Sequence, residues 1–295
     1  MAVISTTVDD LYLFFTPLTS LIWSYLMDYD VACVLVGPDP RQSPLHFAVL
    51  NATLRVGVDV FWIPSVPDVP DATASQVARL FVPLLYADDT YVLTSDNDMW
   101  NLDRAHFAQR DADAGTVMLF YGNAYPGRVP PMYPICYIGM RAALWRTIMS
   151  NAVPALLLRG APLDLDEVTR DIIRAGERRY GAEWNTANKA VSPRWYYDQI
   201  LFGEAIDRWP GHPSKCRIVV RRPGLDRLDR GRWQFRDERD LAGKIDAHLL
   251  RPGFNDENWP RLQRLWAALF RGADTRFVQF AASVRDLFIT SGTTP

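Results

Sequence analysis

The 295-residue sequence contains few cysteines and no surplus of charge of either sign. Its three cysteines, Cys33, Cys136 and Cys216, are far apart, odd in number and never arranged as C-x-x-C. This spacing argues against a disulfide framework and indicates a reducing compartment. Lysine and arginine total 32 against 34 aspartates and glutamates, a net charge of −2, which argues against nucleic-acid binding through a basic face.

Long apolar runs, a basic N-terminal leader and glycine-rich phosphate loops are missing as well. The longest apolar runs, such as 11–15 and 22–27, are too short to span a bilayer. The N-terminus lacks basic residues and carries Asp9 and Asp10 before the apolar stretch, so we expect no signal peptide and a cytoplasmic protein. Without a Walker loop or a G-x-G-x-x-G, a P-loop kinase and a dinucleotide-dependent dehydrogenase both lack their phosphate cradle.

Hydrophobic residues make up 48% of the chain, enough for a core that needs no disulfide or structural metal. Short strand-like runs alternate with helical periodicity in the first hundred residues. Strands are predicted at 11–15, 31–36, 58–63 and 90–94, and helices at 18–29, 44–54 and 74–85. This alternation predicts an α/β fold with a doubly wound, mostly parallel sheet flanked by helices.

Beyond residue 115 the pattern is less regular. Further strands are predicted at 116–120, 135–138 and 217–220, and further helices at 141–150, 164–180, 195–205, 259–270 and 275–289. Because no internal repeat and no flexible linker is found, we expect a single compact domain over 1–295 whose C-terminal part is helical.

The fourth predicted strand runs directly into the acidic sequence Ser95-Asp96-Asn97-Asp98. Doubly wound sheets bind ligands beyond the carboxyl ends of their strands, which is where Asp96 and Asp98 are expected. Two carboxylates one residue apart can turn toward the same point and chelate a hard divalent cation, which in turn carries phosphate oxygens. The alternative is a solvated acidic turn, because aspartate and asparagine are common turn residues.

Three segments carry a resemblance to a known family: the run 16–20, the acidic motif continued by Met99 and Trp100, and the pair Asp198-Gln199. Together they resemble the GT-A fold of nucleotide-sugar-dependent glycosyltransferases, and are similar to glycosyltransferase domains of large DNA viruses that infect algae. The resemblance covers about residues 10–250. It implies a nucleotide-binding half at about 10–115, a half for acceptor and donor sugar at about 116–250, and C-terminal helices at about 251–295.

The resemblance implies transfer of a sugar from a nucleoside diphosphate, most commonly UDP, to a hydroxyl group of an acceptor such as a glycan. It also implies that Asp96 and Asp98 hold Mn²⁺ or Mg²⁺. Many GT-A enzymes take a third metal ligand from a C-terminal histidine, a role that falls to His248, with Asp246 as an alternative. An imidazole beside two carboxylates favours Mn²⁺. A lone histidine is more often a surface or capping residue, and that interpretation stays open.

Residues on several segments are expected to bind the nucleotide or the donor sugar. They are Thr16, Pro17, Leu18, Gly37, Gln76, Arg79, Ser95, Asp96, Asn97, Gly139 and Gln199. The turns after the first two predicted strands, at 16–18 and at Gly37, flank the crevice of a doubly wound sheet. Gln76 and Arg79 share one helix face, from which a basic residue of GT-A enzymes approaches the acidic motif; a solvated arginine is the alternative. Gly139 would allow a close backbone approach to the sugar.

Asp198, which follows three aromatic residues at a predicted helix start, is the predicted catalytic residue. In an inverting enzyme it would act as general base on the acceptor hydroxyl. In a retaining enzyme it would position the sugar or stabilise an oxocarbenium-like centre, and the pair Asp198-Gln199 resembles retaining members. The alternative is a helix-capping aspartate among core aromatics.

Two neighbouring segments and two other functions complete the sequence-based hypotheses. The loop 121–133 is expected to form an acceptor lip. The run 226–230 either supplies cations to the diphosphate or is a solvated charge run, the commoner case. A nucleotidyltransferase remains an alternative, although it normally carries a glycine-rich basic loop where this chain has 16–20. A non-catalytic carbohydrate-binding protein is the other alternative, because aromatics suit sugar stacking.

Overall fold

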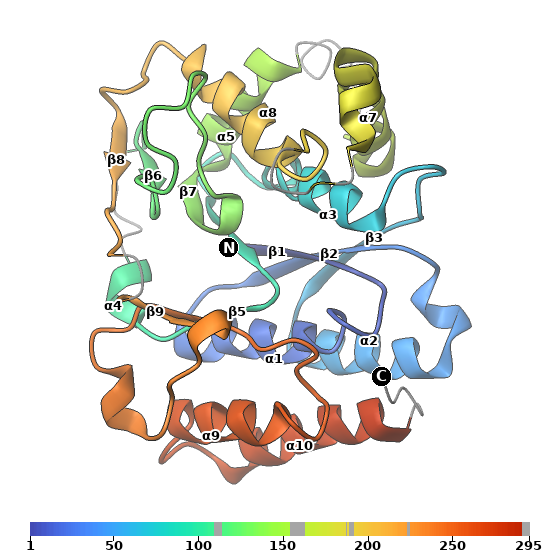
Figure 1. The fold of residues 1–295 in the computed structure, drawn as a ribbon, viewed down its shortest axis with the longest axis vertical. Coiled ribbons are helices and arrows are strands. Elements are labelled where there is room, and N and C mark those ends of the chain that lie inside the picture. Colours follow the sequence, from blue (N-terminus) through green and yellow to red (C-terminus); the bar gives the residue numbers. More distant parts are fainter. Residues whose placement is uncertain (109–113, 154–162, 187, 189–191, 223–224, 291–295) are drawn as a thin grey trace.

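The computed structural model describes residues 1–108, 114–153, 163–186, 188, 192–222 and 225–290 (Figure 1). The main sheet has seven strands in the order β3-β2-β1-β4-β7-β6-β8. Their bounds are β1 Ala2–Thr7, β2 Val31–Val36, β3 Asp59–Ile63, β4 Tyr91–Asp96, β6 Val117–Leu119, β7 Ile138–Arg141 and β8 Cys216–Ile218. Strands β3, β2, β1 and β4 are mutually parallel, while β7 is antiparallel to both its neighbours. The predicted α/β class with a mostly parallel sheet is confirmed.

Helices cover both faces of this sheet, and each face has its own apolar core (Figure 1). One face packs against α1 Phe15–Leu21, α2 Pro44–Arg55, α9 Trp259–Leu269 and α10 Thr275–Thr290. The other face packs against α3 Asp71–Arg79, α5 Ala142–Ala152, α7 Leu165–Tyr180 and α8 Tyr197–Asp207. Strand β1 serves both cores, because Ile4 points into the first and Val3 into the second, as strand alternation requires.

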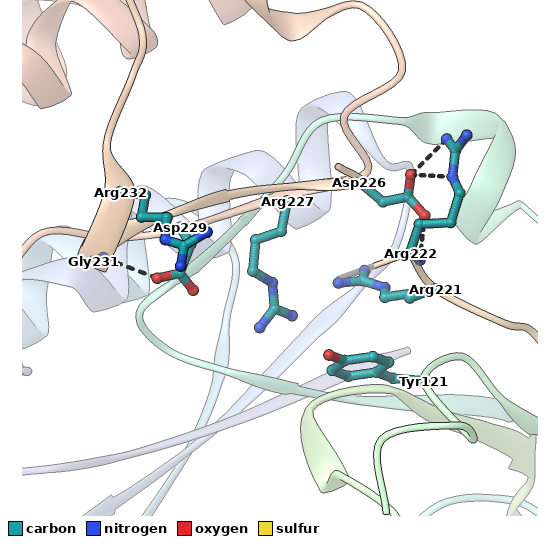
Figure 2. Close-up of a pocket in the computed structure, with 8 residues that line it drawn as sticks. All are labelled: Tyr121, Arg221, Arg222, Asp226, Arg227, Asp229, Gly231 and Arg232. Carbon is teal, nitrogen blue, oxygen red and sulfur yellow. Dashed lines mark hydrogen bonds and ion pairs between the residues drawn. The ribbon is translucent and has the colours of Figure 1, made fainter. Parts of the chain in front are cut away.

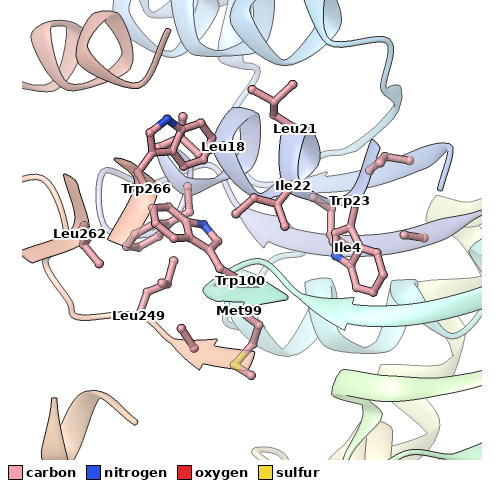
Figure 3. Packing of buried hydrophobic residues seen from close by; sticks show 14 of the residues in the cluster. Ile4, Leu18, Leu21, Ile22, Trp23, Met99, Trp100, Leu249, Leu262 and Trp266 are labelled. Atoms are coloured by element: carbon pink, nitrogen blue, oxygen red, sulfur yellow. The ribbon is translucent and has the colours of Figure 1, made fainter. Parts of the chain in front are cut away.

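A three-stranded sheet lies beside the main one, in the order β5-β10-β9, next to the short helix α4 Arg104–Phe107. Its strands are β5 Met99–Asn101, β9 Arg227–Asp229 and β10 Asp246–His248. Because β5 starts three residues after the end of β4, this small sheet connects the acidic motif directly to the C-terminal third of the chain. Trp100 of β5 packs against Trp266 of α9, with ring centroids 5.3 Å apart (Figure 3).

The prediction of a first strand at 11–15 is wrong, since β1 begins at Ala2 and α1 at Phe15. Asp9 accepts hydrogen bonds from the backbone nitrogens of Leu11 and Tyr12, both at 2.9 Å, so the apolar run lies in a turn. Periodicity cannot separate a short buried strand from a buried turn or helix start. The β-branched composition of Ala2–Thr7 was the available signal for a strand.

Most other predicted elements lie within a few residues of those observed, and the exceptions involve short or interrupted segments. The helix predicted at 18–29 starts earlier, at Phe15, and continues as one π-helical turn over Ile22–Leu26. The helix predicted at 74–85 breaks after Arg79, and a 3₁₀ turn over Val82–Leu85 contains Pro83. The strand predicted at 135–138 is mostly a 3₁₀ turn, Ile135–Tyr137, that precedes β7.

In the described part of the chain, no helix combines the length and the apolar character needed to cross a membrane. The last five residues of the proposed domain 1–295 lie outside the described residues.

Candidate active site

A cavity of about 470 Å³ lies at the carboxyl ends of β1 and β4, beside the N-terminal half of α8 and one face of α3. In the sheet order, β2 and β3 follow on one side of β1 while β4 lies on the other. Strand order therefore reverses between β1 and β4, and this switch point is where open α/β sheets bind ligands. Ser5 of β1 pairs with Asp96 of β4, so the ends of both strands meet at the cavity.

The acidic motif turns sharply after β4 and is supported from behind by α1. The Asn97 side chain donates to the backbone oxygen of Tyr12 at 2.8 Å and to the Thr16 hydroxyl at 3.1 Å. The Thr19 hydroxyl donates to the backbone oxygen of Asn97 at 2.7 Å. These bonds fix the turn so that Asp96 and Asp98, on either side of Asn97, both line the cavity.

Arg79, at the C-terminal end of α3, connects two of the predicted site carboxylates. Its Nη1 forms a short ion pair with Asp96 Oδ1 and donates to the backbone oxygen of Ser95 at 2.8 Å. Its Nη2 lies 3.3 Å from Asp198 Oδ2. The Arg79 residue is only 2% exposed, and although burial opposes its charge, Asp96 and Asp198 raise its pKa. The alternative of a solvated helix arginine is therefore wrong.

Asp198 lies in the first turn of α8 and is 1% exposed. Burial raises its pKa to about 6, with a further upward contribution from Asp96 and an opposing one from Arg79. Its Oδ1 accepts from the backbone nitrogen of Gln199 at 2.8 Å, and its Oδ2 faces Arg79. Both carboxylate oxygens thus already have a donor, and the side chain is held in one orientation toward the cavity.

The pairing of β5 with β10 places His248 opposite Met99, next to Asp98. The Nε2 atom of His248 lies 3.5 Å from Asp98 Oδ2. The same carboxylate oxygen lies 2.9 Å from Arg230 Nη1 and 3.5 Å from Arg251 Nε. Burial alone would raise the pKa of Asp98, but His248 and Arg230 hold it below its usual value.

The other ring nitrogen of His248 is also engaged. Parallel pairing of β9 with β10 sets Asp229 opposite His248, and His248 Nδ1 lies 3.4 Å from Asp229 Oδ2. This carboxylate fixes the ring so that Nε2 faces Asp98, the arrangement that commonly orients metal-binding histidines. The alternative ligand Asp246 is less suited, because it is fully buried and paired with Arg221 and Arg227.

Asp96, Asp98 and His248 fit a divalent ion by their chemistry, since two carboxylates and an oriented imidazole face one cavity. As the side chains stand, Asp96 is turned to Arg79 and Asp98 to Arg230. Within the ranges that the structure describes, no three His, Cys, Asp or Glu side chains are gathered closely enough to hold an ion. Binding would therefore require the Asp96 and Asp98 carboxylates to rotate away from Arg79 and Arg230.

Three amide oxygens of the cavity lining are buried without a hydrogen-bond donor among the described residues. They are Gln76 Oε1, Asn97 Oδ1 and Gln199 Oε1. Buried acceptors are rarely left unpaired, so each of these oxygens could accept a hydroxyl or N–H group that a ligand, or a side-chain rotation, brings to it. Sugar and ribose hydroxyls are groups of that kind.

Several residues predicted to bind the donor are not among those that line the cavity. Thr16, Pro17 and Leu18 are fully buried on α1, and Thr16 reaches the site only through Asn97. Ser95 is fully buried and contributes its backbone oxygen to Arg79. The prediction of a crevice wall at 16–18 depended on the misplaced first strand.

Both predicted glycine contacts serve packing. Gly37, with φ +143°, lies against Val8, and its oxygen accepts from the Trp62 indole at 3.1 Å. At Gly139 an added Cβ would meet the Tyr91 hydroxyl at 2.1 Å, so the close approach there is to Tyr91 in the neighbouring strand β4. Neither glycine is among the cavity-lining residues.

The residues at the end of β1, Tyr12 and Arg251 line the cavity but were not predicted from the sequence. Ser5, Thr6 and Thr7 line it, and the polar run after Ala2–Ile4 was the signal. Tyr12 lines it too, with the Arg251 guanidinium 4.8 Å from its ring centroid. The solvated interpretation of 226–230 is wrong for Arg227 and Arg230, which also line the cavity.

This chain resembles solved structures with which it shares little sequence. No family model matches the sequence, and no curated protein is detectably similar to it. The galactosyltransferase LgtC, solved with donor and acceptor sugar analogs, is 12% identical, with 96% of this chain and 95% of that chain covered and a TM-score of 0.45. An active-site mutant of LgtC is 14% identical over the same coverage, with a TM-score of 0.49.

A glycosyltransferase involved in glycosylation of the major capsid of PBCV-1 is 12% identical. The alignment covers 88% of this chain and 98% of that chain, with a TM-score of 0.31. These likenesses are too distant to carry a function over, so the function has to follow from the chain's own residues.

Proposed function

We propose that this protein is a metal-dependent glycosyltransferase that moves a sugar from a nucleoside diphosphate to a hydroxyl group of a glycan acceptor. The observation that supports it most is the convergence of Asp96, Asp98, Asp198 and His248 with buried Arg79 in one cavity. That cavity lies at the switch point of the sheet, where nucleotides bind in open α/β folds. The proposal treats 1–295 as one catalytic unit, and its cytoplasmic location stays a prediction.

The two ends of the cavity suit the two parts of a nucleotide-sugar donor. Ser5, Thr6 and Thr7 offer hydroxyl and backbone groups at the end of β1, and Tyr12 offers an aromatic ring for a base. UDP is our choice because uridine is the commonest base of such donors. Gln199 and its orphaned amide oxygen lie next to Asp198, where the sugar would bind.

Cationic side chains of the same cavity suit the diphosphate. Arg230 and Arg251 both approach Asp98, and Arg227 lines the cavity with them. Guanidinium groups bind phosphate oxygens in a planar, often bidentate geometry. A divalent ion held by Asp96, Asp98 and His248, with Mn²⁺ preferred over Mg²⁺, would offset the charge that develops on the departing diphosphate.

For Asp198 we favour the role of a retaining enzyme, because the pair Asp198-Gln199 resembles retaining members. The Gln199 backbone nitrogen and Arg79 each donate to one of its carboxylate oxygens and fix its orientation. A carboxylate fixed in this way is suited to stabilise positive charge on the reacting sugar carbon. We therefore assign to Asp198 an electrostatic role beside the donor sugar.

A nucleotidyltransferase is less well supported. The segment that follows β1 reads Val8-Asp9-Asp10-Leu11-Tyr12 and contains two acids and no glycine. Enzymes of that class normally bind triphosphate with a glycine-rich basic loop at this place, and an acidic loop repels it. The choice between an enzyme and a non-catalytic sugar-binding protein requires an activity measurement.

The test is release of UDP from a panel of UDP-sugars by slow hydrolysis in the presence of Mn²⁺. We expect the native protein to release UDP from at least one donor, and Asp198→Asn to lower the rate by roughly a hundredfold or more. Asp207→Asn, on the exposed end of the same helix, is the matched control and should keep the native rate. Equal rates for Asp198→Asn and the native protein would refute the role of Asp198. UDP binding without release from any donor would support the sugar-binding protein.

A further inference from the structure

A second cavity, of about 440 Å³, adjoins the first (Figure 2). Tyr121 and Arg227 line both cavities. Asp229, which holds the imidazole of His248, lines the second cavity as well. A molecule in the second cavity would therefore lie next to the diphosphate end of the proposed donor site.

The lining of this second cavity is dominated by arginine. Four arginines, Arg221, Arg222, Arg227 and Arg232, line it together with two aspartates. Arg222 is paired with Asp226 through its Nη2 at 2.6 Å. The positive charges of the other three arginines are not neutralised by Asp226.

Two of the remaining arginines share one buried carboxylate. Arg221 Nη1 lies 2.7 Å from Asp246 Oδ2, and Arg227 Nε lies 2.8 Å from Asp246 Oδ1. Asp246 is fully buried, and Arg221 is only 3% exposed. One carboxylate neutralises one guanidinium, so the pair leaves a surplus positive charge in a poorly solvated wall, where charge acts strongly.

Arg232 is the third, and its side chain is exposed at the rim of the cavity. Within the described residues it makes no ion pair, and Asp229 beside it is engaged by the backbone nitrogen of Gly231 and by His248. Arg232 is thus an available cation at the cavity mouth, and the surplus positive charge of Arg221 and Arg227 lies in the wall behind it.

An aromatic ring completes the cavity. The guanidinium carbons of Arg221 and Arg227 lie 5.5 and 5.7 Å from the ring centroid of Tyr121, and Figure 2 shows both arginines directed toward the space above that ring. The Tyr121 ring helps to hold the two guanidiniums in place by cation–π contact, so that an acidic substituent entering the cavity would meet fixed arginines.

We propose that this second cavity is the acceptor subsite and that it selects an acceptor sugar bearing an acidic substituent, a carboxylate or a phosphate. The assignment of this cavity as the acceptor subsite rests on the proposed function. The binding of an acidic sugar to the cavity is independent of that function. A uronic acid of the donor would supply the same chemistry, so the experiment has to separate the two sources.

The experiment is a saturation-transfer NMR titration of the full chain with D-glucuronate, and with D-glucose as the neutral analogue, at saturating UDP and Mg²⁺. We expect glucuronate to bind more tightly than glucose. Arg232→Gln should lower the affinity for glucuronate by roughly tenfold. This factor corresponds to the loss of about 1.4 kcal/mol from one charge-assisted hydrogen bond. Arg261→Gln, an exposed arginine of α9 with no ion pair in the described residues, is the matched control and should leave the affinity unchanged.

Equal affinities for glucuronate and glucose, or an affinity that Arg232→Gln does not change, would overturn the proposal. Displacement of glucuronate by UDP-glucuronate but not by UDP-glucose would assign the acidic group to the donor and overturn the acceptor assignment. The same titration without UDP separates the two claims. Arg232-dependent binding of glucuronate by a protein that fails to bind UDP would support the acidic-sugar site and refute the proposed function.

Discussion

At the scale of single residues, Asp198 offers a measurable signature because burial raises its pKa to about 6. The proposed role requires the ionised carboxylate, so kcat/KM for sugar transfer or donor hydrolysis should fall about tenfold per pH unit below pH 6 and level off above it. Arg79 and Asp96 are the charged groups that act on it directly. A rate that stays constant between pH 5 and 7 would contradict an essential carboxylate at this position.

The same group makes a prediction about stability. The folded-state pKa lies above the usual value of 3.8, so the folded protein binds this proton more tightly than the unfolded chain. The contribution of Asp198 to the free energy of unfolding therefore falls as the pH rises from about 4 through about 6. The free energy of unfolding of Asp198→Asn, relative to that of the native protein, should therefore rise by about 2 kcal/mol between pH 4.5 and pH 7.5. Urea unfolding at the two pH values measures this difference. An equal difference at both pH values would contradict the raised pKa.

Asp229 is a positioning residue, since it reaches the proposed metal site only through His248. Asp229→Asn should weaken Mn²⁺ binding in the presence of UDP by about tenfold or more, because the imidazole loses its orienting carboxylate. Isothermal titration of the metal measures this directly, independently of turnover. His248→Ala should weaken Mn²⁺ binding at least as strongly as Asp229→Asn does.

The control for this substitution is Asp274→Asn. Both aspartates accept a hydrogen bond from the backbone nitrogen two residues later, and their side chains are 44% and 41% exposed. Asp274 lies before α10, outside the cavity lining, so its substitution should leave Mn²⁺ affinity unchanged. Equal effects of the two variants would show that Asp229 has only a local structural role.

At the scale of elements, the position of α8 depends on a close approach at Gly203. A Cβ there would lie 1.9 Å from the backbone oxygen of Pro131, in the loop that the helix packs against. Gly203→Ala should therefore lower the free energy of unfolding by about 2 kcal/mol, although alanine is the better helix former. At Gly115 the nearest atom is 3.7 Å away, so Gly115→Ala should change stability by less than about 0.5 kcal/mol. Equal stabilities of the two variants in denaturant would contradict this packing.

The elements also show what the sequence could predict. The strand that ends in the acidic motif was predictable because apolar residues run directly into Asp96 and Asp98. Strand β1 was not recognised, because the run 11–15 is more apolar than Ala2–Thr7. With β1 misplaced, Ser5, Thr6 and Thr7 could not be assigned to the cavity.

Strands β5, β9 and β10 have three residues each and carry no periodicity that could be read. Their pairing brings Asp229 and Arg227 to the site, because β10 pairs both with β9, which is near it in the chain, and with β5, which lies more than a hundred residues earlier. His248 was predicted through the resemblance to a family and not through any local pattern. The run 226–230 was one possible source of cations in the sequence, whereas Arg221, Arg232 and Arg251 could be assigned to the cavities only from the structure.

At the scale of the whole molecule, the C-terminal helices cover the small sheet that carries His248, one of the three proposed metal ligands. Trp266 of α9 is 1% exposed, packs on Trp100 and donates its indole N–H to the backbone oxygen of Phe277 at 2.9 Å. Trp266→Ala should lower the free energy of unfolding by about 4 kcal/mol. The exposed Val278→Ala on α10 should change it by less than about 0.5 kcal/mol, and comparable losses would contradict a core shared by sheet and helices.

The central claim is that the acidic motif binds a nucleoside diphosphate through a divalent ion. Calorimetric titration of UDP into the native protein and into Asp98→Asn, each with and without Mn²⁺, tests it most directly. We predict Mn²⁺-dependent UDP binding by the native protein, and loss of that dependence in Asp98→Asn while its circular dichroism and melting remain native-like. UDP affinity that is the same with and without Mn²⁺, or the same in both proteins, would contradict the account.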